Sequence, residues 1–100
     1  MKLITLALVL SFSVVVVLAQ NKSNKNLATK QLYAVFDTQW QWNMENSPTF
    51  ASFLGDKRYN HRWDDVSLTA IKTRNEHLKL VLAKLNKISR PQLSISDQLN

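Results

Sequence analysis

The residues best suited to chemistry gather in one loop, between Asp56 and Asp65, where cationic, aromatic and acidic side chains crowd together. The candidate functional residues of this loop, either substrate-facing or structural, are Arg58, Tyr59, His61, Arg62 and Asp65. A guanidinium group in a loop is able to hold a carboxylate through two parallel hydrogen bonds. The two arginines therefore suit the binding of an acidic substrate group or, as the more ordinary alternative, pairing with an aspartate of the loop itself.

His61 and the adjacent Asp64-Asp65 pair each allow two interpretations. His61 could line a substrate pocket, but an ordinary loop histidine is the simpler interpretation. The two carboxylates could bind a metal or act as acid and base. Their position just before Ser67, however, favours a place at the positive N-terminus of the following helix. We favour the structural role for the histidine and for the aspartates.

No other constellation of residues points to catalysis. The chain has no cysteine, no His-Glu-x-x-His, no glycine-rich phosphate loop and no Gly-x-Ser-x-Gly. Its two histidines, His61 and His77, have fifteen residues between them, a spacing that does not place two metal ligands on a shared face. His77 is expected to be structural. We therefore assign no catalytic residue, no metal ligand and no cofactor to this chain.

Two long helical segments flank the loop, so we predict an all-α fold of two long helices joined by a short helix and the loop. The first long helix is expected from Leu27 to Glu45, and the second from Leu68 to Ile88 with Ser67 as its N-cap. The short helix should begin at Ser47-Pro48, where a serine hydroxyl caps and proline suits the first helical position. It should end at Gly55, because glycine takes the left-handed conformation that closes a helix.

Both long helices carry an apolar side, and that of the first helix is wider than one partner helix would cover. On the first helix, steps of about 100° per residue place on this side Leu32, Val35, Phe36, Gln39, Trp40 and Asn43. On the second helix the side comprises Ile71, Leu78, Val81, Leu82 and Leu85. Met44 falls on a flank of the first helix. The aromatic rings could form a ligand platform, but we expect core packing, in helices that dock on something larger.

The N-terminal residues predict export. Met1-Lys2 is a short positive start, Leu3 to Leu18 is apolar except for one threonine and two serines, and a small residue follows at Ala19. This pattern is typical of a secretory signal peptide, residues 1–19, cleaved after Ala19. A membrane anchor is the alternative, although about 16 apolar residues fall just short of a bilayer span. We expect a periplasmic or secreted protein, with membrane contact only through an uncleaved signal.

The polar residues 20–26 are predicted to be a flexible mature N-terminus, because they show no periodicity and follow the cleavage site. The formal charge of the whole chain is +6. The basic residues are spread along the chain and not gathered in a run, which favours a solvated face. Together with export, this distribution argues against nucleic acid as a partner.

The last residues resemble the start of another helix, with Ser96 as its expected N-cap. A helix that stops within one turn has no stability of its own. We therefore interpret residues 27–100 as an N-terminal helical segment that is incomplete, and we expect its main partner to be the remainder of the same polypeptide.

The loop sequence Leu54 to Asn60, followed by Arg62, Asp65 and Ser67, resembles the N-terminal region of the bacterial family called domain of unknown function 885. In that family an aromatic-rich helix, a Ser-Pro helix start, a Gly-Asp-x-Arg-Tyr-Asn loop and an Asp-x-Ser cap follow a signal sequence. The similarity covers the mature chain in order. His61 departs from it, since aspartate is commoner at that place, and no lipidated cysteine is present.

The resemblance implies an all-helical protein several times longer, similar to zinc peptidases of the gluzincin type and acting on peptides. Its metal motif would lie far toward the C-terminus, so zinc is implied only for a full-length protein. This chain alone would be inactive and would form part of the helical wall around a cleft. The alternative hypothesis is a small secreted cationic helical binding protein whose aromatic and basic residues contact a partner or anionic lipid.

Overall fold

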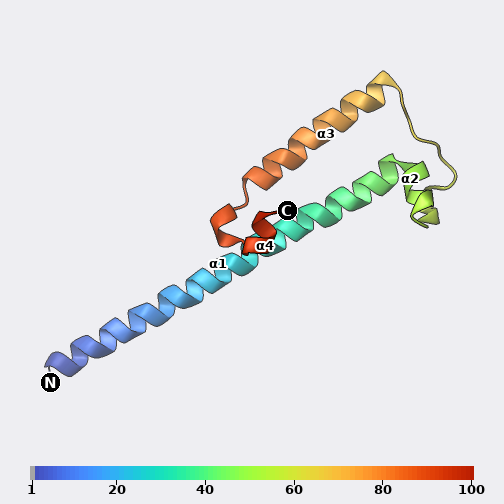
Figure 1. Ribbon diagram of the computed structural model, residues 1–100. Helices are drawn as coiled ribbons and strands as arrows, with labels where there is room; N and C mark the ends of the chain where they lie inside the picture. Colours follow the sequence, from blue (N-terminus) through green and yellow to red (C-terminus); the bar gives the residue numbers. More distant parts are fainter. Residues whose placement is uncertain (1) are drawn as a thin grey trace. The chain divides into compact units, whose positions relative to one another are not determined.

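The computed structural model describes the backbone of residues 2–100 and the side chains from Val16 onward. Every regular element in this part of the chain is helical, which confirms the predicted all-α class (Figure 1). The chain divides into two compact units, residues 31–88 and a second unit that joins residues 1–30 with 89–100. Each unit is described by itself.

The first helix, α1, is longer than the sequence predicts, since it runs from Lys2 to Asn46 and continues into both units. The segment 20–26, expected to be a flexible N-terminus, is helical instead. The physical reason is that neither glycine nor proline occurs between Lys2 and Asn46, so nothing interrupts the backbone hydrogen bonds. The side chains of 16–27, Ala19 included, are exposed.

The predicted signal peptide comprises residues 1–19, and most of its side chains lie outside the described part of the chain. It therefore stays a prediction. Among the described residues, no helix combines the length and the apolar character needed to cross a membrane.

The unit that contains the C-terminal residues holds two short elements, η2 (Arg90–Gln92) and α4 (Ile95–Gln98). The N-cap of α4 is Ser94, whose hydroxyl accepts a hydrogen bond of 3.1 Å from the amide of Asp97. The prediction that Ser96 is this cap was therefore wrong by two residues. Ser94 and Ser96 are both of a residue type that caps helices, and each could accept the amide of the third residue after it. The local sequence therefore does not distinguish between them.

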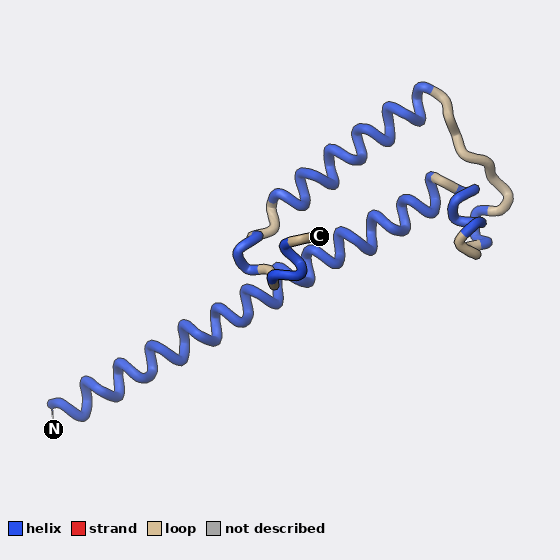
Figure 2. The backbone as a smooth tube through the Cα atoms, viewed as in Figure 1, coloured by secondary structure: helices blue, strands red, loops and turns tan. Residues whose placement is uncertain are grey.

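The unit of residues 31–88 contains the end of α1, the short helix α2 (Pro48–Phe53), the single turn η1 (Lys57–Tyr59) and the helix α3 (Leu68–Asn86). Within this unit the end of α1 and α3 lie side by side and run in opposite directions, joined by α2 and the loop (Figures 1 and 2). A long helix, a short helix and a loop therefore precede the second long helix, as predicted.

Gly55 ends α2 in the predicted way. Its φ of 89° lies in the left-handed region, and it has the only positive φ among residues 2–100. The amide of Gly55 bonds the carbonyl of Ser52 at 3.0 Å, and the amide of Asp56 bonds that of Ala51 at 2.9 Å. These two bonds form a Schellman motif, which satisfies the last carbonyls of the helix.

The start of α3 also follows the prediction, because the hydroxyl of Ser67 accepts a 3.2 Å hydrogen bond from the amide of Ala70. The helix ends at Asn86, two residues before the predicted Ile88. There the amides of Lys87 and Ile88 bond carbonyls only three residues back, so the last turn tightens and leaves the α-helical pattern.

The core of this unit is small: Leu32 is buried well before the end of α1, and the other buried residues lie where α1 gives way to α2. Met44 has the lowest exposure of any large side chain described, 1%, and Pro48 and Ala51 are buried as well. The sequence placed Met44 on a flank of its helix. The structure therefore buries a flank position of the helix, which helical periodicity alone does not predict.

Candidate functional site

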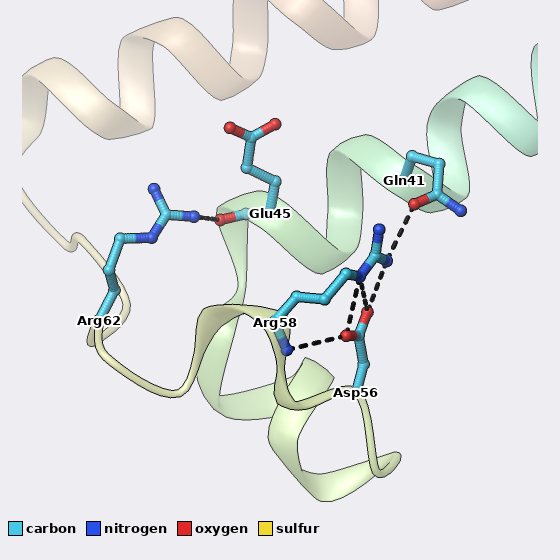
Figure 3. Close-up of polar contacts among 5 residues, drawn as sticks. All are labelled: Gln41, Glu45, Asp56, Arg58 and Arg62. Carbon is cyan, nitrogen blue, oxygen red and sulfur yellow. Dashed lines mark hydrogen bonds and ion pairs between the residues drawn. The ribbon is translucent and has the colours of Figure 1, made fainter.

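The loop from Asp56 to Asp65 is fixed by an ion pair within the loop itself. The carboxylate of Asp56 accepts hydrogen bonds from Nε of Arg58 at 2.9 Å and from its Nη2 at 2.6 Å (Figure 3). The same carboxylate accepts the backbone amide of Arg58 at 3.1 Å. Arg58 is therefore paired internally, and the alternative of a guanidinium free to bind a substrate is not what the structure shows.

This pair shifts both groups toward their charged forms. The hydrogen bond from Arg58 lowers the pKa of Asp56, and the same bond raises the pKa of Arg58. The guanidinium also donates to Oε1 of Gln41 at 2.9 Å, so it ties the loop to the end of α1 (Figure 3). Its role in the described unit is to position the loop.

Arg62 and Tyr59 complete this side of the loop. Nη2 of Arg62 donates to the backbone carbonyl of Glu45, while the Glu45 carboxylate points away from it (Figure 3). The ring of Tyr59 lies 5.2 Å from each of the guanidinium carbons of Arg58 and Arg62, within the range of a cation–π contact. Tyr59 thus contacts both guanidinium groups of the loop.

Asp64 and Asp65 do not act together. Asp64 accepts hydrogen bonds from the amide of Thr49 at 3.1 Å and from its hydroxyl at 2.5 Å. Thr49 is the second residue of α2, so Asp64 caps the preceding helix and not the following one. For Asp64 the predicted place at the following helix was therefore wrong. The bonds from Thr49 also lower the pKa of Asp64.

Asp65 behaves as predicted and serves the start of α3. Its Oδ1 accepts the amide of Ser67 at 2.9 Å, and this bond lowers the pKa of the carboxyl group. Its backbone carbonyl accepts a 2.8 Å bond from Nη1 of Arg74. In contrast, the expected capping by the Ser47 hydroxyl is not found, and the acceptor for the amide of Thr49 in α2 is Asp64.

His61 is exposed, and among the described side chains none forms a hydrogen bond or ring contact with it. Of the five candidate residues, the structure brings Arg58, Tyr59 and Arg62 together, and Asp65 lines a pocket that Arg62 also reaches. His61 remains outside this group.

His77 makes side-chain contacts that join α3 to α1, which the sequence did not reveal. Its ring stacks on Trp42 with centroids 3.9 Å apart and planes inclined by 3°, and Nε2 lies 2.8 Å from Oε1 of Gln39. Burial lowers the pKa of His77, and the charge of Lys84 adds to this effect. The sequence indicates the stacking of His77 on Trp42 only weakly. The two residues lie on different predicted helices, and whether they meet depends on how those helices face each other.

A pocket of about 290 Å³ opens between the loop, the end of α1 and the first turns of α3. Two arginines reach it, Arg62 from the loop and Arg74 from α3. The other lining residues are Glu45, Asn46, Pro48, Trp63, Asp65, Thr69, Ala70 and Thr73. The lining is mostly polar, and Trp63 is 86% exposed at its edge.

The zinc that the sequence resemblance implies finds no matching donor set in the described residues. No three of their histidine, cysteine, aspartate and glutamate side chains gather closely enough to hold a metal ion. His77 is engaged with Trp42 and Gln39, and the nearby carboxylates of Asp64 and Asp65 accept backbone amides. We therefore derive no chemical step through a metal here.

Comparison with known proteins gives no relative: the chain matches no family model, no curated protein and no solved structure.

Proposed function

We propose that this chain is the exported N-terminal helical part of a larger hydrolase, similar to the metallopeptidase-like proteins of domain of unknown function 885. In this proposal the helices form part of the wall of a cleft, and the zinc site and the peptide-cleaving groups belong to other residues of the polypeptide. The observation that supports the proposal is an apolar face on residues 31–88 that this unit leaves uncovered.

The contact between His77 and Trp42 shows which sides of α1 and α3 face each other. On α3, Ala70, His77 and Val81 follow the seven- and four-residue spacing of one helical stripe, and all three are partly covered. On α1 the corresponding stripe includes Leu32, which is buried, and Gln39, which bonds His77.

A second apolar stripe on α3 lies about 100° further round the helix. Ile71, Leu78 and Leu82 each come one residue after a member of the inward stripe, and they are 43%, 53% and 58% exposed. The helix has no buried residue at all. The apolar side that the sequence predicted for α3 is therefore only half used within this unit.

A matching stripe lies on α1, where Tyr33 and Trp40 come one residue after Leu32 and Gln39. Tyr33 is 48% exposed, with its ring edge-on to Phe36, and Trp40 is 51% exposed. The expected core role of Trp40 is thus not realised within the described unit.

The two outward stripes lie on the same side of the helix pair. Since α1 and α3 run in opposite directions, a step of one residue forward turns toward the same side on both helices. The resulting apolar face consists of Tyr33, Trp40, Ile71, Leu78 and Leu82. Covering each half-exposed side chain would contribute roughly 1 kcal/mol or more. A further helix laid along this face would therefore gain substantial stability, as expected of one layer in a larger helical protein.

The experiment is to compare the full reading frame of the gene with residues 20–100 in a zinc-dependent peptide hydrolysis assay. We expect activity only in the longer protein, and we expect a chelator to abolish it. Activity in residues 20–100 alone would contradict the proposal. A longer protein without peptidase activity would remove the hydrolase assignment.

The apolar face provides a second, independent readout. In the longer protein, Leu78→Glu should destabilise the fold by about 2 kcal/mol or more, because a buried carboxylate would have no partner. Leu80→Glu is the matched control, since Leu80 is 63% exposed and lies off this face. Two observations together would favour the alternative, a small secreted binding protein. They are a reading frame that stops after Asn100 and a monomer with sharp NMR spectra.

A further inference from the structure

We propose that the pocket beside the loop binds the free carboxylate of a small ligand, of the size of an amino acid or a dipeptide, between Arg62 and Arg74. This inference concerns residues 45–74 alone and does not depend on the proposed hydrolase function. It starts from the different states of the arginines around the loop.

Three arginines lie near the loop, and their bonding separates them into two kinds. Arg58 is fully engaged, with Asp56 and Gln41 as partners. Arg62 and Arg74 instead each donate to one backbone carbonyl, that of Glu45 and that of Asp65. Among the described residues, neither Arg62 nor Arg74 forms an ion pair within 4 Å, although the charge of Arg74 contributes to the lowered pKa of Asp64 and of Asp65.

The carbonyl bonds make these two side chains suitable as binding groups. A guanidinium has five N–H donors, so a single carbonyl bond fixes its position and leaves most of the donors for a ligand. Arginine offers these donors in a planar fork that matches a carboxylate. Fixing the side chain beforehand also reduces the entropy lost when a ligand binds.

The rest of the lining supports a ligand that also carries a cationic or polar end. The hydroxyl-bearing side chains Thr69 and Thr73 are four residues apart and therefore share one side of α3. The acidic residues at the pocket, Glu45 and Asp65, suit the ammonium group of an amino acid or peptide. The Glu45 carboxylate points away from Arg62, which leaves that arginine to the ligand carboxylate (Figure 3).

The size of the pocket limits the ligand. Its volume of about 290 Å³ lies at the lower end of small-molecule sites. The exposed indole of Trp63 borders it and could cover the ligand. A dipeptide therefore suits this pocket better than a long peptide or a folded partner.

The test is an NMR titration of the full chain with glycylglycine, followed through the indole N–H of Trp63 and the side-chain N–H of Arg74. Glycylglycinamide serves as the matched probe that lacks the carboxylate. We expect saturable binding of glycylglycine, and binding of the amide to be about tenfold weaker or worse, since charge-assisted hydrogen bonds are lost. Equal affinity for the two probes would overturn the proposal.

The arginine is tested by Arg74→Gln, with Lys79→Gln as the control that removes the same charge from an exposed position on α3. We expect about tenfold weaker binding of glycylglycine for Arg74→Gln and no change for the control. Equal weakening in both variants would indicate general charge attraction and overturn the site.

Circular dichroism shows whether the Arg74→Gln variant keeps its helices. If it does not, Arg74→Lys retains the charge and the capacity to bond the Asp65 carbonyl but removes the planar fork, and binding should still weaken several-fold. Binding of inorganic sulfate without binding of glycylglycine would overturn the assignment of the ligand as a carboxylate.

Discussion

Two regions of residues 31–88 differ in how their side chains are buried and bonded. One is the chain reversal between Met44 and Ser67, and the other is the helix α3 that follows it. The reversal contains the three buried side chains Met44, Pro48 and Ala51 and a dense set of hydrogen bonds from its loop. Helix α3 has no buried residue, and its one ion pair joins two exposed side chains at 4.0 Å. The reversal therefore has buried side chains and side-chain hydrogen bonds of its own, whereas α3 leaves its outer apolar side chains exposed within residues 31–88.

The largest expected effect comes from the small core of the reversal. Met44→Ala should lower the free energy of unfolding by about 2 to 4 kcal/mol, because a fully buried side chain leaves a cavity. In the chain of residues 1–100 by itself, Leu82→Ala on α3 should change the free energy of unfolding by less than about 0.5 kcal/mol, since that side chain is 58% exposed. Urea denaturation of the two variants measures both values. Similar losses would show that the two regions do not differ as described.

Gly55→Ala should follow in size, with a loss of about 1 to 2 kcal/mol. The cause is the backbone conformation alone, since an added Cβ would meet no atom within 4 Å while φ is 89°. Thermal melting measures the loss, and Lys57→Ala, at an exposed position two residues further on, serves as the control. An unchanged melting temperature would mean that the turn adopts another conformation in solution.

Asp64→Ala should cost about 0.5 to 1 kcal/mol, because α2 would lose its capping acceptor. Ser47→Ala should have almost no effect, since Ser47 makes no capping bond despite its N-cap position. The comparison of these two variants by urea denaturation tests whether the cap comes from the loop. A larger loss for Ser47→Ala would contradict the structure.

The smallest expected effect is a pH dependence that separates the two regions. The pKa of His77 in the folded state is lowered from 6.5, so the unfolded state binds the proton first as pH falls. Stability should therefore be complete above about pH 6.5 and decrease as pH falls from there toward the folded pKa. The contribution should vanish in His77→Gln.

The loop should respond only at lower pH. The pKa values of Asp56, Asp64 and Asp65 are all lowered from 3.8, so their contribution is present above about pH 3.8 and is lost as pH falls through the folded values. Unfolding monitored by far-UV circular dichroism from pH 8 to pH 2 distinguishes the two ranges. A single transition range would show that the histidine contact and the loop are not separate.

The helices and most of their ends could be predicted from the sequence, because the signals are local. Pro48, Gly55 and Ser67 act on backbone groups within a few residues, and the structure confirms each of them. The internal pairing of Arg58 with Asp56 is local as well, two residues apart.

The rest depends on contacts between residues distant in the chain, which periodicity does not encode. Asp64 reaches Thr49 fifteen residues back, and His77 meets Trp42 from another helix. Met44 is buried although periodicity places it on a flank of its helix. The pocket with Arg74 was missed for the same reason, since nothing near Arg74 in the sequence marks it as a neighbour of the loop.

The bond between Asp64 and Thr49 also has a consequence for the order in which this part of the chain assembles. A closure of fifteen residues costs chain entropy, so the short helix can gain its cap only after the intervening loop has formed. Pro48 has no amide proton, which leaves the amide of Thr49 as the first donor of α2. The hydrogen-exchange rate of the Thr49 amide therefore reports how often the whole turn opens.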